Sequence, residues 1–418
     1  MNSAPLPERP RPSARFWYLA GMCPYFCAIG IQNVVMTWLL TQVLHESPSR
    51  VGLAQMLTML PMLTVILLGG VVADRRELRR LLITLQLAMA LLPLILSGLI
   101  WAGFLSYAAL VLVSVSIGIL GAFIVPARDA MLSAVDDGEI HRTVTAMTGL
   151  QFTSQIAGLL LGGGADWLAA HLGAGPLDPL GAAVLLLLQG GLIGAAALTS
   201  TGLPVTGRPQ TGSENPQGAV RGILQGFAAA GDSDVIRPVL VLLFLAGALF
   251  TSIFLVQLPL LVREVYHGGS ITLATLSICF MGGAALAALI LRRAPPVRRQ
   301  GRAIMLASGV NGLIMALVSF TPPIPVLLIL AALWGICGSF TIMISRALVQ
   351  AASPEGVRGR ILSIYQLSFA GGAPFGSYAM GLIIGWLGVA QAALVPAIGM
   401  AMLLTVTRLY SGLWRLRY

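Results

Sequence analysis

The chain has 418 residues, of which 57% are hydrophobic and only 10% are charged, with a mean hydropathy of +0.89. Soluble globular proteins carry about 25% charged residues, so this composition excludes that class and places the chain in a lipid bilayer. The formal net charge of +10 does not indicate nucleic-acid binding, which requires basic residues gathered on one solvated surface. Here they lie at the ends of apolar runs, next to membrane lipid.

Twelve apolar runs follow one another along the chain, each close to the roughly 20 residues that cross a bilayer as a helix. They predict an all-α membrane protein with twelve transmembrane helices in two pseudo-symmetric six-helix halves. The predicted spans are 17–43, 51–73, 81–101, 106–126, 144–170, 180–200, 238–262, 272–291, 303–321, 325–345, 361–386 and 389–408.

A long polar interruption after the sixth run divides the chain. The predicted parts are a tail (1–15), an N-terminal half (16–203), a linker (204–237), a C-terminal half (238–410) and a second tail (411–418). The halves resemble repeats, because segment 136–144 corresponds to segment 353–361 at an offset of 217 residues. Paired six-helix repeats are typical of secondary transporters, with the substrate site between the halves.

The arginines fix the predicted topology. All 25 basic residues are arginine, and only Arg50 and Arg263 fall outside the tails and every second loop. Because basic residues accumulate on the cytoplasmic side, both termini and the linker are expected in the cytoplasm.

Neither a disulfide framework nor a metal site or cofactor is expected. The four cysteines all fall inside predicted spans, and the four histidines are scattered without ligand spacing.

The loop after the second span reads GGVVADRRELRR over residues 69–80. It resembles the signature loop of the major facilitator superfamily, with Glu77 in place of the second glycine. The resemblance implies a latch in which the Asp74 carboxylate meets a helix N-terminus and a guanidinium at the cytoplasmic side, both of which favour the anion. An ordinary positive-inside loop would explain the arginines but not the aspartate. The matching residues are Gly70, Asp74, Arg75, Arg79 and Arg80.

Three further stretches look like the branch that holds bacterial enterobactin exporters and macrolide-efflux proteins. They are PARDAML at 126–132, LPLLVREV at 258–265 and RGRILSIY at 358–365. Asp129, Arg358 and Arg360 from these stretches join the expected gating set. In contrast to many proton-coupled antiporters of the superfamily, the fourth span has no arginine and the fifth has no Gly-Pro.

Ionisable residues are nearly absent from mid-depth, although they mark function inside a bilayer. A cavity without deep charge suits a neutral, apolar or bulky aromatic substrate. Gln32 and Asn33 are the best candidates, because span one lines the cavity in this superfamily, but each candidate could equally form an interhelical hydrogen bond. The full set is Gln32, Asn33, Gln151, Gln155, Gln257, Trp334, Tyr365 and Gln366.

The resemblance implies a monomeric, multi-pass transporter of the bacterial inner membrane that exports a small amphipathic substrate, a drug or a siderophore, by alternating access. Proton coupling is expected on the same ground, with Glu264, Asp129 or Asp166 as carrier. Glu264 is favoured because span seven lines the cavity in the family, unless Arg263 pairs with it. The alternatives are a lipid or lysophospholipid flippase, a receptor that has lost transport, and an intramembrane enzyme, for which no catalytic constellation lies at membrane depth.

Overall fold

The computed structural model describes residues 13–135, 140–175, 177–205, 230–231, 233–293, 297, 299–354 and 358–410, without the side chains of 66–71, 73–75, 140–142 and 410. Regular structure in these ranges is helical, which confirms the all-α expectation. Ten segments among the described residues are long and apolar enough to cross a membrane. The helices α2 and α5, which complete the expected set, contain some of the side chains that are not described.

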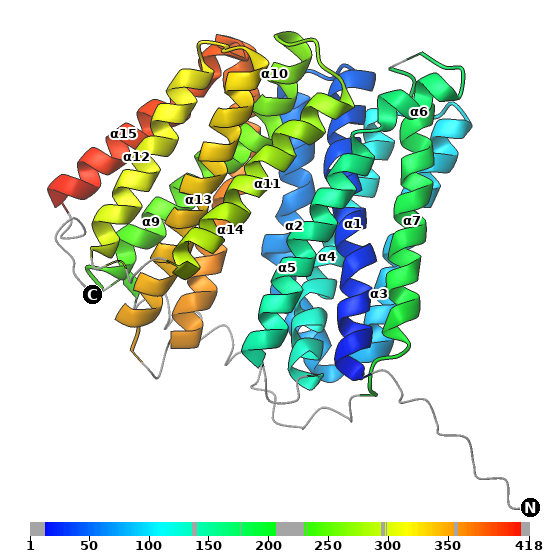
Figure 1. Cartoon of the computed structure of the whole chain (residues 1–418), viewed down its shortest axis with the longest axis horizontal. Coiled ribbons are helices and arrows are strands. Elements are labelled where there is room, and N and C mark those ends of the chain that lie inside the picture. The colour runs from blue at the N-terminus through cyan, green and yellow to red at the C-terminus, as the bar shows by residue number, and fades with distance from the viewer. Residues whose placement is uncertain are drawn as a thin grey trace, which may run out of the picture.

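The helices form two groups, on the right and the left of Figure 1. The first group contains α1 (Ala14–Trp38), α2 (Pro48–Arg75), α3 (Leu78–Trp101), α4 (Tyr107–Ala134), α5 (Ile140–Gly162), α6 (Ala165–His171) and α7 (Leu180–Ser200). The second contains α9 (Ile236–Ala246), α10 (Leu258–Glu264), α11 (Ser270–Arg293), α12 (Gln300–Val318), α13 (Ile324–Ala352), α14 (Arg358–Leu387) and α15 (Leu394–Tyr410).

Side chains cap several of these helices where the sequence leaves an apolar run. Ser13 Oγ accepts a hydrogen bond from the Phe16 amide at the start of α1, and Ser106 Oγ accepts one from Ala109 at the start of α4. Such caps satisfy amides that have no partner inside the helix. Glu77, which replaces the signature glycine, caps α3 in the same way.

The predicted fifth span, 144–170, is wrong as one continuous helix. It breaks at Gly163 and Gly164 into α5 and the short α6. The physical reason is packing: a Cβ at Gly163 would lie 2.7 Å from the Ala274 Cβ of α11, so the chain approaches its neighbour more closely than a larger residue permits.

Two spans contain π-helical turns. Leu39–Val43 (η1) follows α1, and the span over Ile236–Glu264 contains Gly247–Thr251 (η2) and Ile253–Gln257 (η3) between α9 and α10. A further 3₁₀ turn, Gln391–Ala393 (η5), precedes α15. Turns of the π type are rare and often mark functional positions.

One close helix contact occurs in both groups. Gly158 of α5 meets the carbonyl of Cys27 in α1, and Gly372 of α14 meets the carbonyl of Phe244 in α9, in each case leaving no room for a Cβ. Cys27 and Phe244 are 217 residues apart, and Gly158 and Gly372 are 214 apart. Small residues of this kind let membrane helices approach closely. Gly30 against Gln155 and Gly247 against Phe369 repeat the correspondence.

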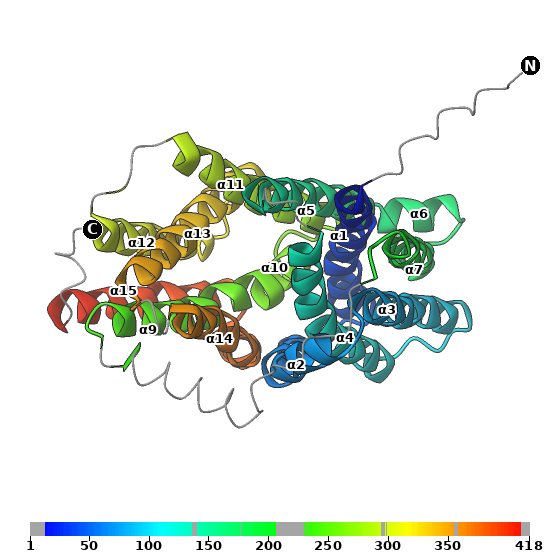
Figure 2. The same ribbon diagram turned by 90° about the horizontal axis from the view of Figure 1, so that it is seen from below.

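The groups meet at the end of the bundle away from the two chain termini, which we call the far end; the opposite end is the terminal end (Figure 1). There Gly52 of α2 contacts Ser377 of α14, and Gly163 contacts Ala274 of α11. Seen from the terminal end, α14 lies beside α2 and α11 lies beside α5 (Figure 2). Toward the terminal end the helices of the two groups diverge in Figure 1.

Candidate functional site

A cavity of about 140 Å³ lies between the two helix groups. Its first-group side is largely polar, with Asn33 and Thr37 from α1 and Gln55 and Thr58 from α2. Its second-group side is mostly apolar and includes Phe254 of η3. The remaining lining residues are Gln32, Val34, Met36, Leu40, Ala54, Leu110, Ser114, Leu255, Leu258, Pro259, Leu273 and Ser277.

A second cavity, of about 310 Å³, lies inside the second group. Phe254 lines both cavities, so the two are neighbours. Around Phe254 the ring centroids of Phe280 and Trp334 lie 5.0 and 6.1 Å away, and those two rings are 4.9 Å apart. Phe250, Phe369 and Asn311 also line it. The residues that line the two cavities carry no charge, so the site can bind a neutral molecule with polar and aromatic parts.

Several residues singled out from the sequence line these cavities. Gln32 and Asn33 line the first and Trp334 lines the second. The Gln32 amide oxygen also accepts a hydrogen bond from Gln189 Nε2 at 3.3 Å, so Gln32 is partly committed to a contact between α1 and α7.

Other predicted residues lie outside the two linings. Gln257 is fully buried and donates to the Val389 carbonyl at 2.6 Å. Tyr365 is buried and its hydroxyl donates to the Ile342 carbonyl at 2.6 Å. These contacts correspond to the interhelical alternative. Gln151 and Gln155 are half-buried on α5, and Gln366 is exposed.

Sequence reasoning missed Gln55 and Asn311, although both are polar residues within apolar runs and the argument used for Gln32 applies to them. It also missed the phenylalanines of the second cavity. Aromatic residues are common in apolar spans, and nothing in the sequence shows which ones face a common space.

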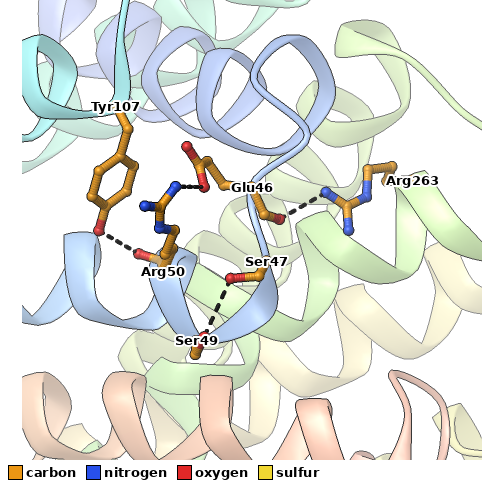
Figure 3. Close-up of polar contacts among 6 residues, drawn as sticks. All are labelled: Glu46, Ser47, Ser49, Arg50, Tyr107 and Arg263. Carbon is orange, nitrogen blue, oxygen red and sulfur yellow. Dashed lines mark hydrogen bonds and ion pairs between the residues drawn. The ribbon is translucent and has the colours of Figure 1, made fainter.

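Arg263 connects the groups at the far end (Figure 3). Its Nη1 donates to the Thr41 carbonyl at 2.9 Å and to the Glu46 carbonyl at 3.1 Å, while its Nη2 pairs with Glu264. Arg50, by contrast, pairs with Glu46 inside the first group at 3.0 Å. The Tyr107 hydroxyl donates to the Arg50 carbonyl at 2.9 Å.

Asp166 forms a second connection at the same end. Its Oδ2 accepts hydrogen bonds from the Ser270 amide at 2.6 Å and the Ser270 hydroxyl at 2.9 Å. The carboxylate of α6 therefore caps α11 of the other group, where the helix dipole favours an anion. Its Oδ1 is buried without a hydrogen-bond partner.

The signature-loop residues lie at the terminal end. The side chains of Gly70, Asp74 and Arg75 are outside the described residues, so the structure does not test the latch. Arg79 is half-buried. Arg80 is exposed, and its Nε lies 3.3 Å from Glu77.

The other gating candidates also lie near that end. Asp129 pairs with Arg128 at 3.5 Å, and the Arg128 guanidinium lies 5.2 Å from the Phe26 ring centroid. Arg358 Nε is buried without a hydrogen-bond partner, and Arg360 is half-buried with a partner of its own.

Within the part of the chain that the structure describes, no cluster of His, Cys, Asp and Glu could hold a metal ion. Cys23, Cys27, Cys279 and Cys337 carry free thiols.

Comparisons with known proteins agree with this architecture. A sequence model of the family described as "Transmembrane secretion effector" matches residues 14–413. Among curated protein sequences, none matches this chain.

Solved transporters have a similar fold. The nucleoside transporter NupG superposes with a TM-score of 0.73 at 11% identity, covering 95% of this chain and 98% of that one. An inward-facing, unoccupied bacterial homolog of the human lysosomal transporter Spinster gives 0.67 at 13% identity, covering 99% and 97%. A D-xylose-proton symporter gives 0.67 at 14%, covering 92% and 95%. At these identities the likeness concerns the fold alone.

Proposed function

Since the chain belongs to the transmembrane secretion effector family of the major facilitator superfamily and is a membrane transporter, we propose that it exports a neutral, amphipathic aromatic molecule by alternating access. The observation that carries this proposal is the uncharged double cavity. Polar groups line its first-group side, and Phe254, Phe280 and Trp334 surround the second. A charged substrate would lose its hydration there without gaining an opposite charge.

The repeated glycine contacts support two pseudo-symmetric halves. Contacts between halves follow the same symmetry: α2 with α14 and α5 with α11 are equivalent pairs if each half contributes six spans. Two such halves can rock about the site that lies between them.

The arginine distribution supports cytoplasmic termini in a bacterial inner membrane. In that orientation the far end is external, and Arg263 and Asp166 hold it closed. The structure then corresponds to a state open toward the cytoplasm, ready to take up a substrate for export. The Asp74 loop would close the terminal end in the opposite state.

Asp166 is the proton carrier that we favour. Protonation would remove the negative charge from the N-terminus of α11 and weaken the acceptor of both Ser270 hydrogen bonds. Opening of the external side would thereby be coupled to proton uptake from outside. Glu264 is less suited, because its carboxylate is paired with Arg263.

The test uses everted membrane vesicles with and without the protein, and radiolabelled 1-naphthyl glucoside, a neutral aromatic glycoside. Export predicts accumulation inside energised vesicles that contain the protein, and collapse of this accumulation by a protonophore. Asp166→Asn should abolish gradient-driven accumulation but retain exchange of bound probe. Accumulation equal to that of protein-free vesicles would refute export of this substrate class, and accumulation insensitive to the protonophore would refute only the proton coupling.

A further inference from the structure

The cavity inside the second helix group is built around three aromatic rings from three helical segments. Phe254 of η3 and Phe280 of α11 are tilted by 38°, and Trp334 of α13 presents its ring at 66° and 61° to them. Aromatic rings favour offset or edge-to-face neighbours, and this arrangement leaves faces and edges of both kinds around one space. The volume of about 310 Å³ lies at the lower end of the range of roughly 300–1,000 Å³ for small-molecule sites.

One amide in this apolar lining has unused hydrogen-bonding capacity. Asn311 of α12 is 2% exposed, lines the cavity, and its Oδ1 has no hydrogen-bond partner. Buried polar atoms are nearly always hydrogen-bonded, so an exception calls for an explanation. The neighbouring Thr341 hydroxyl does not satisfy it, because it donates to the Cys337 carbonyl at 3.0 Å. The Asn311 oxygen is therefore an acceptor available to a ligand.

The backbone is also specialised at this cavity. Phe250 lies in the π turn η2 and Phe254 lies in the next π turn, η3. In the first group, the corresponding stretch of α1 is a regular α-helix through Trp38. Such π turns change the direction of side chains and are frequent at functional sites, and here they carry two of the aromatic residues that line the cavity.

We propose that this cavity is a binding subsite for an aromatic ring that bears an O–H or N–H donor, which donates to Asn311 Oδ1. The subsite rests on the proposed function only in that its ligand is the exported molecule. Binding to the rings requires a planar apolar surface, and the buried oxygen disfavours any ligand that fills the cavity without a donor, since the oxygen would stay unpaired.

Equilibrium binding to the purified full-length protein in phosphatidylcholine nanodiscs tests the subsite. The probes are 1-naphthol and 1-methoxynaphthalene, which share a ring system but differ in the donor. Wild type should bind 1-naphthol about tenfold tighter, because loss of one partner of a buried hydrogen bond leaves the other unsatisfied. Asn311→Leu should remove this preference, and Phe280→Leu should weaken binding of both probes while keeping it.

The matched control is Gln86→Leu, which removes a buried amide of α3 that accepts from Ser200 at 2.9 Å, outside both cavities. It should keep the naphthol preference, and each variant must elute as a single monodisperse species. Equal affinity of wild type for the two probes, or a preference retained in Asn311→Leu, would overturn the subsite. Displacement of both probes by lysophosphatidylcholine with no naphthol preference would instead identify an acyl-chain site and also overturn it.

The binding result separates this proposal from export itself. Selective binding without accumulation in vesicles would leave the subsite standing and refute export. Accumulation in vesicles together with an unchanged preference in Asn311→Leu would leave export standing and refute the subsite.

Discussion

Asn33 and Thr37 of α1 lie 217 residues before Phe250 and Phe254 of the second group, and each pair lines a cavity. A third pair agrees: Thr58 is the residue whose carbonyl Gly118 approaches, and Phe280 is the one that Gly335 approaches. At corresponding positions the first group therefore presents amides and hydroxyls, whereas the second presents phenyl rings. The packing is repeated and the lining is not.

The far end shows the same divergence. Glu46 and Arg263 are 217 residues apart, but carry opposite charges, and Arg263 donates to the Glu46 carbonyl. Glycine is needed wherever a Cβ would enter a neighbouring backbone, so those positions are constrained in both groups. Side chains that face a cavity or a closing interface are free to differ, and the two-part site arises from that freedom.

The largest effect is expected where the groups are alike. Gly158→Ala and Gly372→Ala should each destabilise the protein by about 1–3 kcal/mol, toward the upper end, because the added Cβ meets a backbone carbonyl. Thermal unfolding of the purified variants measures this. Gly191→Ala, on an exposed face with open space around it, should stay within about 0.5 kcal/mol of wild type. A loss in only one group would show that the packing is not shared.

Arg263 tests the difference at the far end. Arg263→Met removes charged donors to two carbonyls, each worth about 1.5–3 kcal/mol, and should favour opening of this end. In a background without native cysteines, Thr37→Cys should then react with a membrane-impermeant thiol reagent from the far side at least about tenfold faster. Arg50→Gln breaks an ion pair within one group at an arginine that is 59% exposed, so its labelling rate should barely change. Equal rates for the two variants would contradict the closing role of Arg263.

Asp166 should have a smaller effect on the same measurement. Asp166→Ala removes a helix cap, typically worth about 0.5–2 kcal/mol, and this cap joins the two groups. Asp178 is the matched control, because its Oδ1 accepts from the Leu180 amide at 2.9 Å within the first group. Asp178→Ala should lower stability without increasing far-end labelling. If both variants increase labelling alike, the effect is general loosening.

The helical architecture was largely predictable, because an apolar run long enough to cross a bilayer leaves the backbone few alternatives to a helix. The predicted spans correspond to the helices throughout, apart from the break at Gly163 and Gly164. That break depends on Ala274, which is more than a hundred residues away. A local pattern carries no information about such a contact.

The site was only partly predictable. Gln32 and Asn33 were identified because an amide in an apolar run is conspicuous, but Gln257 looks the same in sequence and is used up by the Val389 carbonyl. Asp166 was one of three candidate carriers, and its bond to Ser270 appears only once α6 meets α11. Which polar side chains remain free is decided by packing.

The smallest predicted effect concerns the polar side of the site. Because Phe254 lines both cavities, a ligand with its ring in the second can extend a polar end toward Asn33 in the first. For 1-naphthyl glucoside, compared with 1-methoxynaphthalene, we expect the sugar to add about 0.5–1.5 kcal/mol, one ordinary hydrogen bond, or roughly a twofold to tenfold gain in affinity.

Asn33→Leu should remove that gain and leave the affinity for 1-methoxynaphthalene unchanged, whereas Phe280→Leu should weaken both ligands by the same factor. Equilibrium binding in nanodiscs measures the four affinities in one format. A sugar increment that survives Asn33→Leu, and also survives Gln55→Leu, would place the polar end elsewhere. The contrast between the two groups would then be a feature of packing without a role in recognition, because the amides of the first group would face a space that the ligand does not use.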